Sequence, residues 1–296
     1  MKTIRTIREL REAVRERRAA GLGQVGFVPT MGYLHEGHAS LIRQARAASG
    51  TVVVSIFVNP LQFGPNEDYE AYPRNEARDL ELAQREGADF VFIPSVEEMY
   101  PEPTLTKVSV SSITAPLCGA SRPGHFDGVT TVVMKLFNIV KPDAAYFGLK
   151  DAQQVAVLRR MNEDLNLDID IVACPIVREA DGLALSSRNV YLSAEERREA
   201  LVLSRSLREA YAAIESGAVS TAEEAGRLLR GRIAASPAAV IDYVEVLSFP
   251  GLEAIRPDQT LQDVEGEVIM ALAVKFGRTR LIDNIVFTPK EVPACV

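Results

Sequence analysis

Two of the three histidines in this 296-residue chain stand three residues apart, in the segment His35-Glu36-Gly37-His38. The apolar run 24–28 before it predicts a strand, and the pattern from about residue 39 predicts a helix. A helix N-terminus presents unpaired backbone N–H groups and a partial positive charge, which favour phosphate. Side chains at this spacing face one side of the first turn, so both imidazoles could donate hydrogen bonds to phosphate oxygens. The alternative interpretation is a pair of structural histidines beside a turn.

The glycines of this segment, Gly32 and Gly37, would let the backbone approach a ligand closely. Attack of a carboxylate on an α-phosphate builds negative charge, and donors already in place lower the barrier of such a reaction. The segment therefore predicts a nucleotide site that could activate a small carboxylic acid as an acyl-adenylate.

Two further loops carry a cation where nucleotide could bind. Lys150 stands between a strand predicted for 144–147 and a helix predicted for 152–165, and it could act as a mobile cation for phosphate. Asp151 beside it could cap the helix or bind a ribose hydroxyl. The loop Leu185-Ser186-Ser187-Arg188-Asn189 supplies two hydroxyls and a guanidinium, which suit a triphosphate. A simple linker to the next helix is the alternative for this loop.

Neutral polar side chains follow the β-branched run 51–58, which is typical of a strand buried on both faces. Asn59 and Gln62 could bind a small hydroxy acid, although Asn-Pro and glycine also mark turns. The glycine-rich loop from Arg122 to Gly128 includes His125, and it could contact a phosphate or carboxylate or lie in solvent. The predicted helix 152–165 opens with two glutamines, Gln153 and Gln154, of which one is expected to face the pocket.

A second glycine pattern does not predict a cofactor site. The segment 21–26 matches G-x-G-x-x-G, but a dinucleotide fingerprint must follow a strand and open a helix. This one follows a predicted helix and runs into a strand, so it is interpreted as a turn. The sequence also contains no G-x-x-x-x-G-K-[ST] phosphate loop.

Alternating helices and apolar strands predict the elements that must position these residues. Helices are expected at 4–20, 39–48, 76–86, 129–139 and 152–165, with strands at 24–28, 51–58, 90–93, 144–147 and 169–173. Such alternation predicts an α/β fold, a Rossmann-like parallel sheet with helices on both faces, which binds ligands at the carboxyl ends of its strands. We expect this nucleotide-binding domain to span residues 1–184.

A smaller α+β domain is expected over residues 185–296, closing over the active site. Ser193 and Glu196 form a capping-box signature for a long helix to about residue 216. A helix over 221–235 and antiparallel strands over 241–247, 267–276 and 279–286 follow. Gly277-Arg278 predicts a hairpin turn between the last two strands.

Composition limits the class of protein. Hydrophobic residues make up 47% and the formal net charge is −7, the balance of a soluble globular protein without the basic surface of a nucleic-acid binder. Neither an 18-residue apolar stretch nor a transit-peptide composition is present, so no membrane partner is expected. Cys118, Cys174 and Cys295 are far apart and lack metal-ligand spacing, which indicates a reducing, cytoplasmic location.

Five segments resemble, in order, those of the pantoate–β-alanine ligase family: PTMGYLHEGH, FVNPLQFGPNEDYEAYPR, RPGHFDGVTTVV, AYFGLKDAQQ and DGLALSSRN. The resemblance covers nearly the whole chain. The first segment is also similar to the HIGH signature of a nucleotidyltransferase superfamily, and the Leu-Ser-Ser-Arg loop is similar to its KMSKS counterpart.

The resemblance implies a two-step reaction, a homodimer and a pantoate site in the domain 1–184. ATP and (R)-pantoate, with Mg²⁺, would give pantoyl-adenylate and pyrophosphate, and the amine of β-alanine would then release AMP and form pantothenate. It implies that His38 is the proton donor and that His35 and Lys150 are the other catalytic residues. No residue is assigned as a metal ligand. The implied ATP-binding residues are Met31, Gly32, Tyr33, Leu34, His35, Glu36, Gly37, His38, Gly148, Leu149, Lys150, Asp151, Val177, Leu185, Ser186, Ser187 and Arg188. The implied substrate-binding residues are Gln62 and Gln154 for pantoate, Gln62 also for β-alanine, and Asn59, Arg122 and His125 in neighbouring family segments.

Two positions depart from the family pattern, because Leu149 replaces a usual Glu or Gln and Leu185 replaces a usual Met. The proton-donor role is also not required by the chemistry of the first step, since an attacking carboxylate has no proton to lose. We therefore expect His38 to stabilise charge on phosphate, as imidazolium or through one N–H. The alternatives are a nucleotidyltransferase of the same superfamily, which would need more cations than Asn59 and Gln62 supply, and a non-catalytic nucleotide-binding module.

Overall fold

The computed structural model describes residues 1–65 and 67–289. Its internal contacts divide the chain into two compact units. The first unit consists of Met1–Ser111, Arg122–Leu149 and Val157–Val177, and the second of Ser112–Ser121, Lys150–Ala156 and the chain from Arg178 onward. The second unit thus includes two segments, Ser112–Ser121 and Lys150–Ala156, that precede residue 185. A single division of the chain at residue 185, as expected from the sequence, would place both segments in the first domain.

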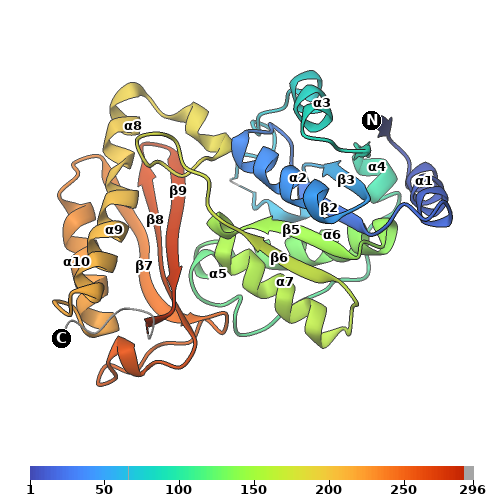
Figure 1. The fold of residues 1–296 in the computed structure, drawn as a ribbon. Coiled ribbons are helices and arrows are strands. Elements are labelled where there is room, and N and C mark those ends of the chain that lie inside the picture. Colours follow the sequence, from blue (N-terminus) through green and yellow to red (C-terminus); the bar gives the residue numbers. More distant parts are fainter. Residues whose placement is uncertain (66, 290–296) are drawn as a thin grey trace. The chain divides into compact units, whose positions relative to one another are not determined.

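The first unit is built on a six-stranded parallel sheet with the order β1-β4-β3-β2-β5-β6 (Figure 1). Its strands are β1 (Lys2–Ile4), β2 (Val25–Thr30), β3 (Thr51–Ile56), β4 (Phe90–Phe92), β5 (Ala144–Gly148) and β6 (Asp170–Cys174). Five of the six residues of β3 are buried, as expected for a central strand covered on both faces. The predicted α/β class is confirmed.

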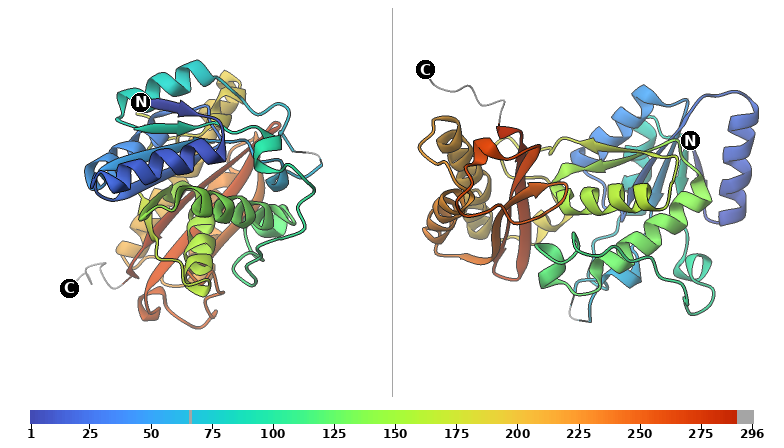
Figure 2. Two further views of the ribbon diagram at one scale, coloured as in Figure 1. Left: turned by 90° about the vertical axis from the view of Figure 1, so that its right-hand side faces the viewer. Right: turned by 90° about the horizontal axis from the view of Figure 1, so that it is seen from below.

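Helices cover both faces of this sheet (Figure 2). They are α1 (Ile7–Ala19), α2 (Glu36–Ala48), α3 (Glu76–Arg85), α4 (Val96–Met99), α6 (His125–Val140) and α7 (Ala152–Asp164), with the 3₁₀ turns η1 (Pro60–Gln62) and η2 (Leu149–Asp151). Adjacent residues of β2 show the two faces, because successive side chains of a strand point to opposite sides. Phe27 packs edge-on against Phe137 of α6, while Val28 belongs to the buried cluster that contains Ile42 of α2.

The second unit contains a three-stranded antiparallel sheet: β7 (Ala239–Phe249), β8 (Glu267–Phe276) and β9 (Thr279–Phe287). Its helices are α5 (Cys118–Ser121), α8 (Ala194–Ala200), α9 (Val202–Glu215) and α10 (Ala222–Ala234), with 3₁₀ turns η3 (Ser187–Tyr191) and η4 (Leu261–Asp263). Helices α9 and α10 lie along one side of this sheet (Figure 1), and their leucines share one buried cluster with β7 and β8. The predicted hairpin at Gly277-Arg278 is confirmed, since Phe276 pairs with Thr279.

Three local predictions were wrong. The first helix begins at Ile7, not residue 4, because Lys2–Ile4 pairs with β4 as an edge strand, a contact that local sequence does not reveal. The long helix predicted from Ser193 is two helices separated at Leu201, although its capping box with Glu196 is confirmed. The helix predicted from 129 begins at His125.

Other predictions concern turns, membranes and cysteines. Residues 21–24 form the turn expected after α1, with positive φ at Gly21 and Gly23, and residues 25–26 already belong to β2. Within the described residues, no helix combines the length and apolarity needed to cross a membrane. Cys118 and Cys174 are buried free thiols, and Cys295 lies outside the described residues.

Candidate active site

Helix α2 begins with the two histidines. His35 is the N-cap, and its Nδ1 accepts a hydrogen bond from the Gly37 N–H at 3.1 Å. His38, three residues on, returns its Nδ1 to the His35 N–H at 3.3 Å, which completes a capping box made from two imidazoles. The ring centroids lie 4.2 Å apart. The helix thus starts three residues earlier than predicted, with His35 as its N-cap and His38 in its first turn.

This capping arrangement determines the tautomer of each neutral ring. A neutral imidazole carries one proton, and a ring nitrogen that accepts a hydrogen bond cannot hold it. Because Nδ1 accepts in both His35 and His38, the proton of each neutral ring is on Nε2. Each ring therefore has one N–H that could be donated to a phosphate oxygen.

The backbone before α2 adopts a left-handed conformation. Gly32 has φ +87° and Tyr33 has φ +52°. A Cβ at Gly32 would lie 2.9 Å from Cγ2 of Ile56, so the position needs glycine for space as well as for conformation. Asp79 of α3 accepts hydrogen bonds from the next two backbone N–H groups, those of Tyr33 and Leu34.

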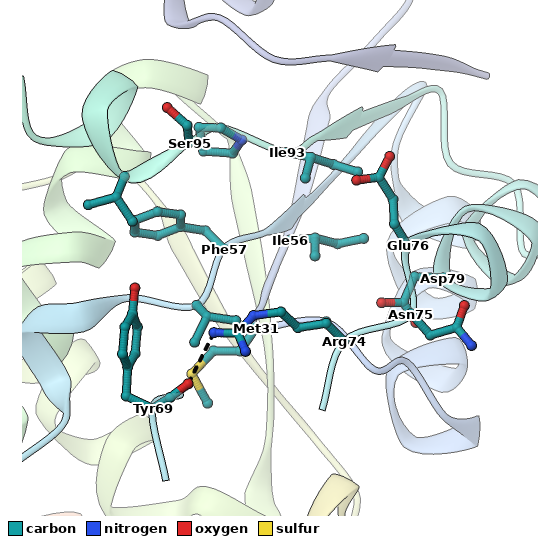
Figure 3. Close-up of a pocket in the computed structure, with 14 residues that line it drawn as sticks. Met31, Ile56, Phe57, Tyr69, Arg74, Asn75, Glu76, Asp79, Ile93 and Ser95 are labelled. Atoms are coloured by element: carbon teal, nitrogen blue, oxygen red, sulfur yellow. Dashed lines mark hydrogen bonds between the residues drawn. The ribbon is translucent and has the colours of Figure 1, made fainter. Parts of the chain in front are cut away.

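A pocket of about 250 Å³ opens in the first unit at the carboxyl ends of β2, β3 and β4, the edge predicted to bind ligands (Figure 3). Met31 and Gly32 of the predicted site line it. Figure 3 shows the Arg74 guanidinium beside Met31, where it donates to the Tyr69 carbonyl at 3.0 Å. The remaining lining residues are Ile56, Phe57, Val58, Asn75, Glu76, Asp79, Ile93, Pro94, Ser95 and Val96. Apart from Met31 and Gly32, none of the lining residues was predicted from the sequence. Tyr69 and Arg74 could have been predicted, because they lie in the NEDYEAYPR part of a segment that resembles the family.

Gln62 is held by hydrogen bonds to its side chain. Its Oε1 accepts from Asn59 Nδ2 at 3.1 Å, and its Nε2 lies 3.2 Å from the sulfur of Met31. Asn59 is 1% exposed, and its amide also bonds Gly128 O, Leu61 N–H and the Tyr100 hydroxyl. The amide of Asn59 is therefore occupied within the protein. Sequence reasoning did not identify Tyr100, which is distant in sequence.

The backbone of Gln62 is held by a second network. His125 Nδ1 lies 2.9 Å from the Gln62 carbonyl, which can only accept, so Nδ1 carries the proton and Nε2 accepts from Arg122 at 3.0 Å. Arg122 in turn binds both carboxylate oxygens of Glu67 and donates to the same carbonyl. Burial raises and the Arg122 hydrogen bonds lower the pKa of Glu67, with a net downward shift. Arg122 and His125 thus position Gln62 through its backbone carbonyl.

If Gln62 binds pantoate, as the sequence resemblance implies, replacing Glu67 with Gln should raise the KM for pantoate roughly tenfold, because hydrogen bonds to charged groups contribute about 1.5–3 kcal/mol and Arg122 would lose its ionised partner. The KM for ATP should stay within about twofold. Glu70→Gln, an exposed acid of the same segment, is the matched control. Equal pantoate KM values for both variants in steady-state assays would contradict this positioning role.

In the second unit, Lys150 follows β5 in the turn η2. Its Nζ forms an ion pair with Asp151 Oδ2 at 3.1 Å, and its backbone carbonyl accepts from Asn284 Nδ2 of β9 at 3.0 Å. Gln153 is buried and bonds Cys118 N–H and the carbonyls of Ile113 and Pro116. Gln153 is therefore structural, and Gln154 is the half-buried glutamine.

The loop at 185–188 has its own local hydrogen bonds. The hydroxyl of Ser186 caps η3 by accepting from the Arg188 N–H at 3.2 Å, and Ser187 is buried. Leu185 and Arg188 are half-buried, as are Leu149 and Val177, which end two segments of the first unit. Among the described residues, no cluster of three or more His, Cys, Asp or Glu could hold a metal ion.

Comparison with known proteins decides the family. The model of the family described as pantoate-beta-alanine ligase matches residues 2–286. The chain belongs to the pantoate–β-alanine ligase family. A pantothenate synthetase of Pelotomaculum thermopropionicum is 57% identical over 281 residues, 95% of this chain and 97% of that protein. One of Acetivibrio thermocellus is 55% identical over 287 residues, covering 97% and 99%.

Solved structures of the family agree. Pantothenate synthetase from Thermus thermophilus gives a TM-score of 0.89 at 48% identity, covering 96% of this chain and 99% of that one. Pantoate-beta-alanine ligase from Francisella tularensis, complexed with beta-gamma ATP and beta-alanine, gives 0.75 at 32% identity, covering 99% and 100%. The resemblance inferred from five sequence segments is therefore confirmed, while the roles of individual residues stay predictions.

Proposed function

We propose that the chain catalyses the ATP-dependent condensation of (R)-pantoate with β-alanine to pantothenate, through a pantoyl-adenylate, with release of pyrophosphate and AMP. Family membership supports the reaction class, and the Francisella tularensis ligase was crystallised with beta-gamma ATP and beta-alanine. The observation that carries the proposal is the double-histidine capping box, which gives each neutral ring one Nε2–H at a helix N-terminus.

In the first step, a pantoate carboxylate oxygen attacks the α-phosphorus and the bond to the pyrophosphate oxygen breaks. The carboxylate has no proton to lose, so the residues must stabilise charge on the phosphates. We assign this role to His35, His38 and Lys150. The other residues assigned to ATP are Met31, Gly32, Tyr33, Leu34, Glu36, Gly37, Gly148, Leu149, Asp151, Val177, Leu185, Ser186, Ser187 and Arg188.

In the second step, the amine of β-alanine attacks the acyl carbon, the bond to AMP breaks, and the amine loses a proton. We assign Gln62 and Gln154 to pantoate and Gln62 also to β-alanine. The contacts of Asn59, Arg122 and His125 support a positioning role, because each holds Gln62. We infer that Mg²⁺ accompanies ATP, since this ion is commonly held by substrate phosphates and few protein ligands.

The proposal is tested by pantoate-dependent exchange of labelled pyrophosphate into ATP without β-alanine. Exchange is expected with pantoate and absent with pantolactone, which has no free carboxylate. A nucleotidyltransferase or a pure binding module would give no exchange, so its absence from folded protein would reject the ligase proposal.

We further propose a cytoplasmic homodimer in which the smaller domain closes during the reaction. Light scattering coupled to size exclusion measures the assembly, and a mass of one chain, 32.4 kDa, would contradict the dimer.

A further inference from the structure

We propose that Asp79 is a positioning residue that holds residues 32–34 in the conformation that places His35 and His38 for phosphate. This inference rests on the proposed function. It concerns a residue of α3 that lies 46 positions away in sequence from Tyr33, whose backbone it contacts.

Asp79 is 1% exposed, and both of its carboxylate oxygens face the segment. Oδ2 accepts from the Tyr33 N–H at 2.8 Å, and Oδ1 accepts from the Leu34 N–H at 2.6 Å. Charge-assisted bonds of this kind are stronger than neutral ones. The carboxylate thus fixes the direction of two consecutive peptide groups.

The fixed peptides follow directly on the left-handed residues Gly32 and Tyr33. A left-handed tyrosine is unfavourable and persists only where its surroundings hold it. Arg78, next to Asp79, supplies a second contact, since its guanidinium lies 5.1 Å from the centre of the Tyr33 ring. Helix α3 therefore holds this turn through two neighbouring side chains.

The consequence for the histidines follows from the chain itself. Leu34 is fully buried, and the next residue, His35, caps α2 and pairs with His38. A change in the Leu34 peptide would therefore rotate the N-cap and move both imidazoles. Small displacements of groups that act on a reacting centre can lower rates about 100-fold.

Burial of this carboxylate is unfavourable in itself. Burial raises the pKa of Asp79, and the two backbone donors lower it, with a net upward shift. Asparagine would remove the buried charge but could accept at only one of its two side-chain atoms. One of the two N–H groups would then lose its partner while the side-chain volume stays nearly unchanged.

The test compares Asp79→Asn with Glu81→Gln, which removes the same charge from an exposed position of α3. Pyrophosphate exchange should fall about tenfold or more in Asp79→Asn. Amine transfer from enzyme-bound adenylate should change by less than about twofold, because the phosphate step is already complete. Glu81→Gln should resemble wild type in both measurements.

A second measurement does not depend on activity. Hydrogen exchange at the Tyr33 and Leu34 amides should accelerate in Asp79→Asn and stay unchanged in Glu81→Gln. If Asp79→Asn folds poorly, Asp79→Glu provides a second variant, because it keeps both carboxylate acceptors. Its rate of pyrophosphate exchange should lie between those of Asp79→Asn and wild type. Equal pyrophosphate exchange in the Asn and Gln variants, or unchanged amide protection, would overturn the inference. If the wild-type enzyme showed no pantoate-dependent pyrophosphate exchange, the proposed function would be overturned instead.

Discussion

His38→Ala should lower the rate of adenylate formation by about 10²–10³-fold, the cost of losing one donor to a developing oxyanion. The reason lies in the capping box: Nδ1 of His38 accepts from the His35 N–H, so the neutral ring carries its proton on Nε2, the nitrogen that we propose donates to phosphate. Single-turnover measurements that separate adenylate formation from amine transfer give the two rates. Amine transfer should be much less affected.

Alanine at position 38 also removes the acceptor of the His35 N–H, one of the two hydrogen bonds of the capping box, so two further variants are needed to separate this structural effect from the loss of the phosphate donor. His38→Asn keeps an acceptor near the Nδ1 position and should preserve the start of α2 while losing the phosphate donor. His38→Gln places an amide near the Nε2 position and should retain more adenylation than the Asn variant. A His38→Asn enzyme with a near wild-type adenylation rate would refute the charge-stabilising role.

Lys150→Ala should lower adenylate formation by about 10²-fold or more, because a cation beside the phosphates acts where negative charge develops. The backbone around Lys150 is held independently of its ammonium group, since Asn284 donates to its carbonyl. The substitution should therefore remove the charge without displacing the turn η2. The measured quantity is the ratio of the adenylation rate to the amine-transfer rate.

Two comparisons sharpen this prediction. Lys275→Ala removes a lysine from an exposed position of β8 in the same unit and should leave both rates unchanged. Lys150→Arg keeps the charge but presents a planar fork, so partial activity is expected. If Lys150→Ala slowed both steps equally, a role limited to the phosphates would be excluded.

The structure changes how several polar side chains of the first unit are understood. Asn59, Arg122 and His125 were candidates for direct substrate contact, yet their hydrogen bonds connect them to Gln62 and Glu67. An amide or guanidinium whose hydrogen-bonding groups already bind other protein groups is better suited to orienting a neighbouring side chain than to binding a substrate. The pantoate assignment therefore depends most on Gln62.

The sequence by itself determined the family and the α/β class, and it supplied the segments to which we assign the chemistry. These follow from local patterns: the H-x-x-H spacing, the buried run of β3 and the turn at Gly277 are each encoded within a few residues. Family membership added reaction chemistry that spacing alone left open.

Only the tertiary structure decided which groups hold those segments in place. Local sequence could not show that Asp79 binds the turn at Tyr33, or that Tyr100 bonds Asn59, because each pair is brought together by packing of distant elements. It also decided the protonated nitrogen of His35 and His38, since that depends on which backbone N–H each ring meets. Residue types and spacing are properties of the chain, whereas hydrogen-bond partners exist only once the chain has folded.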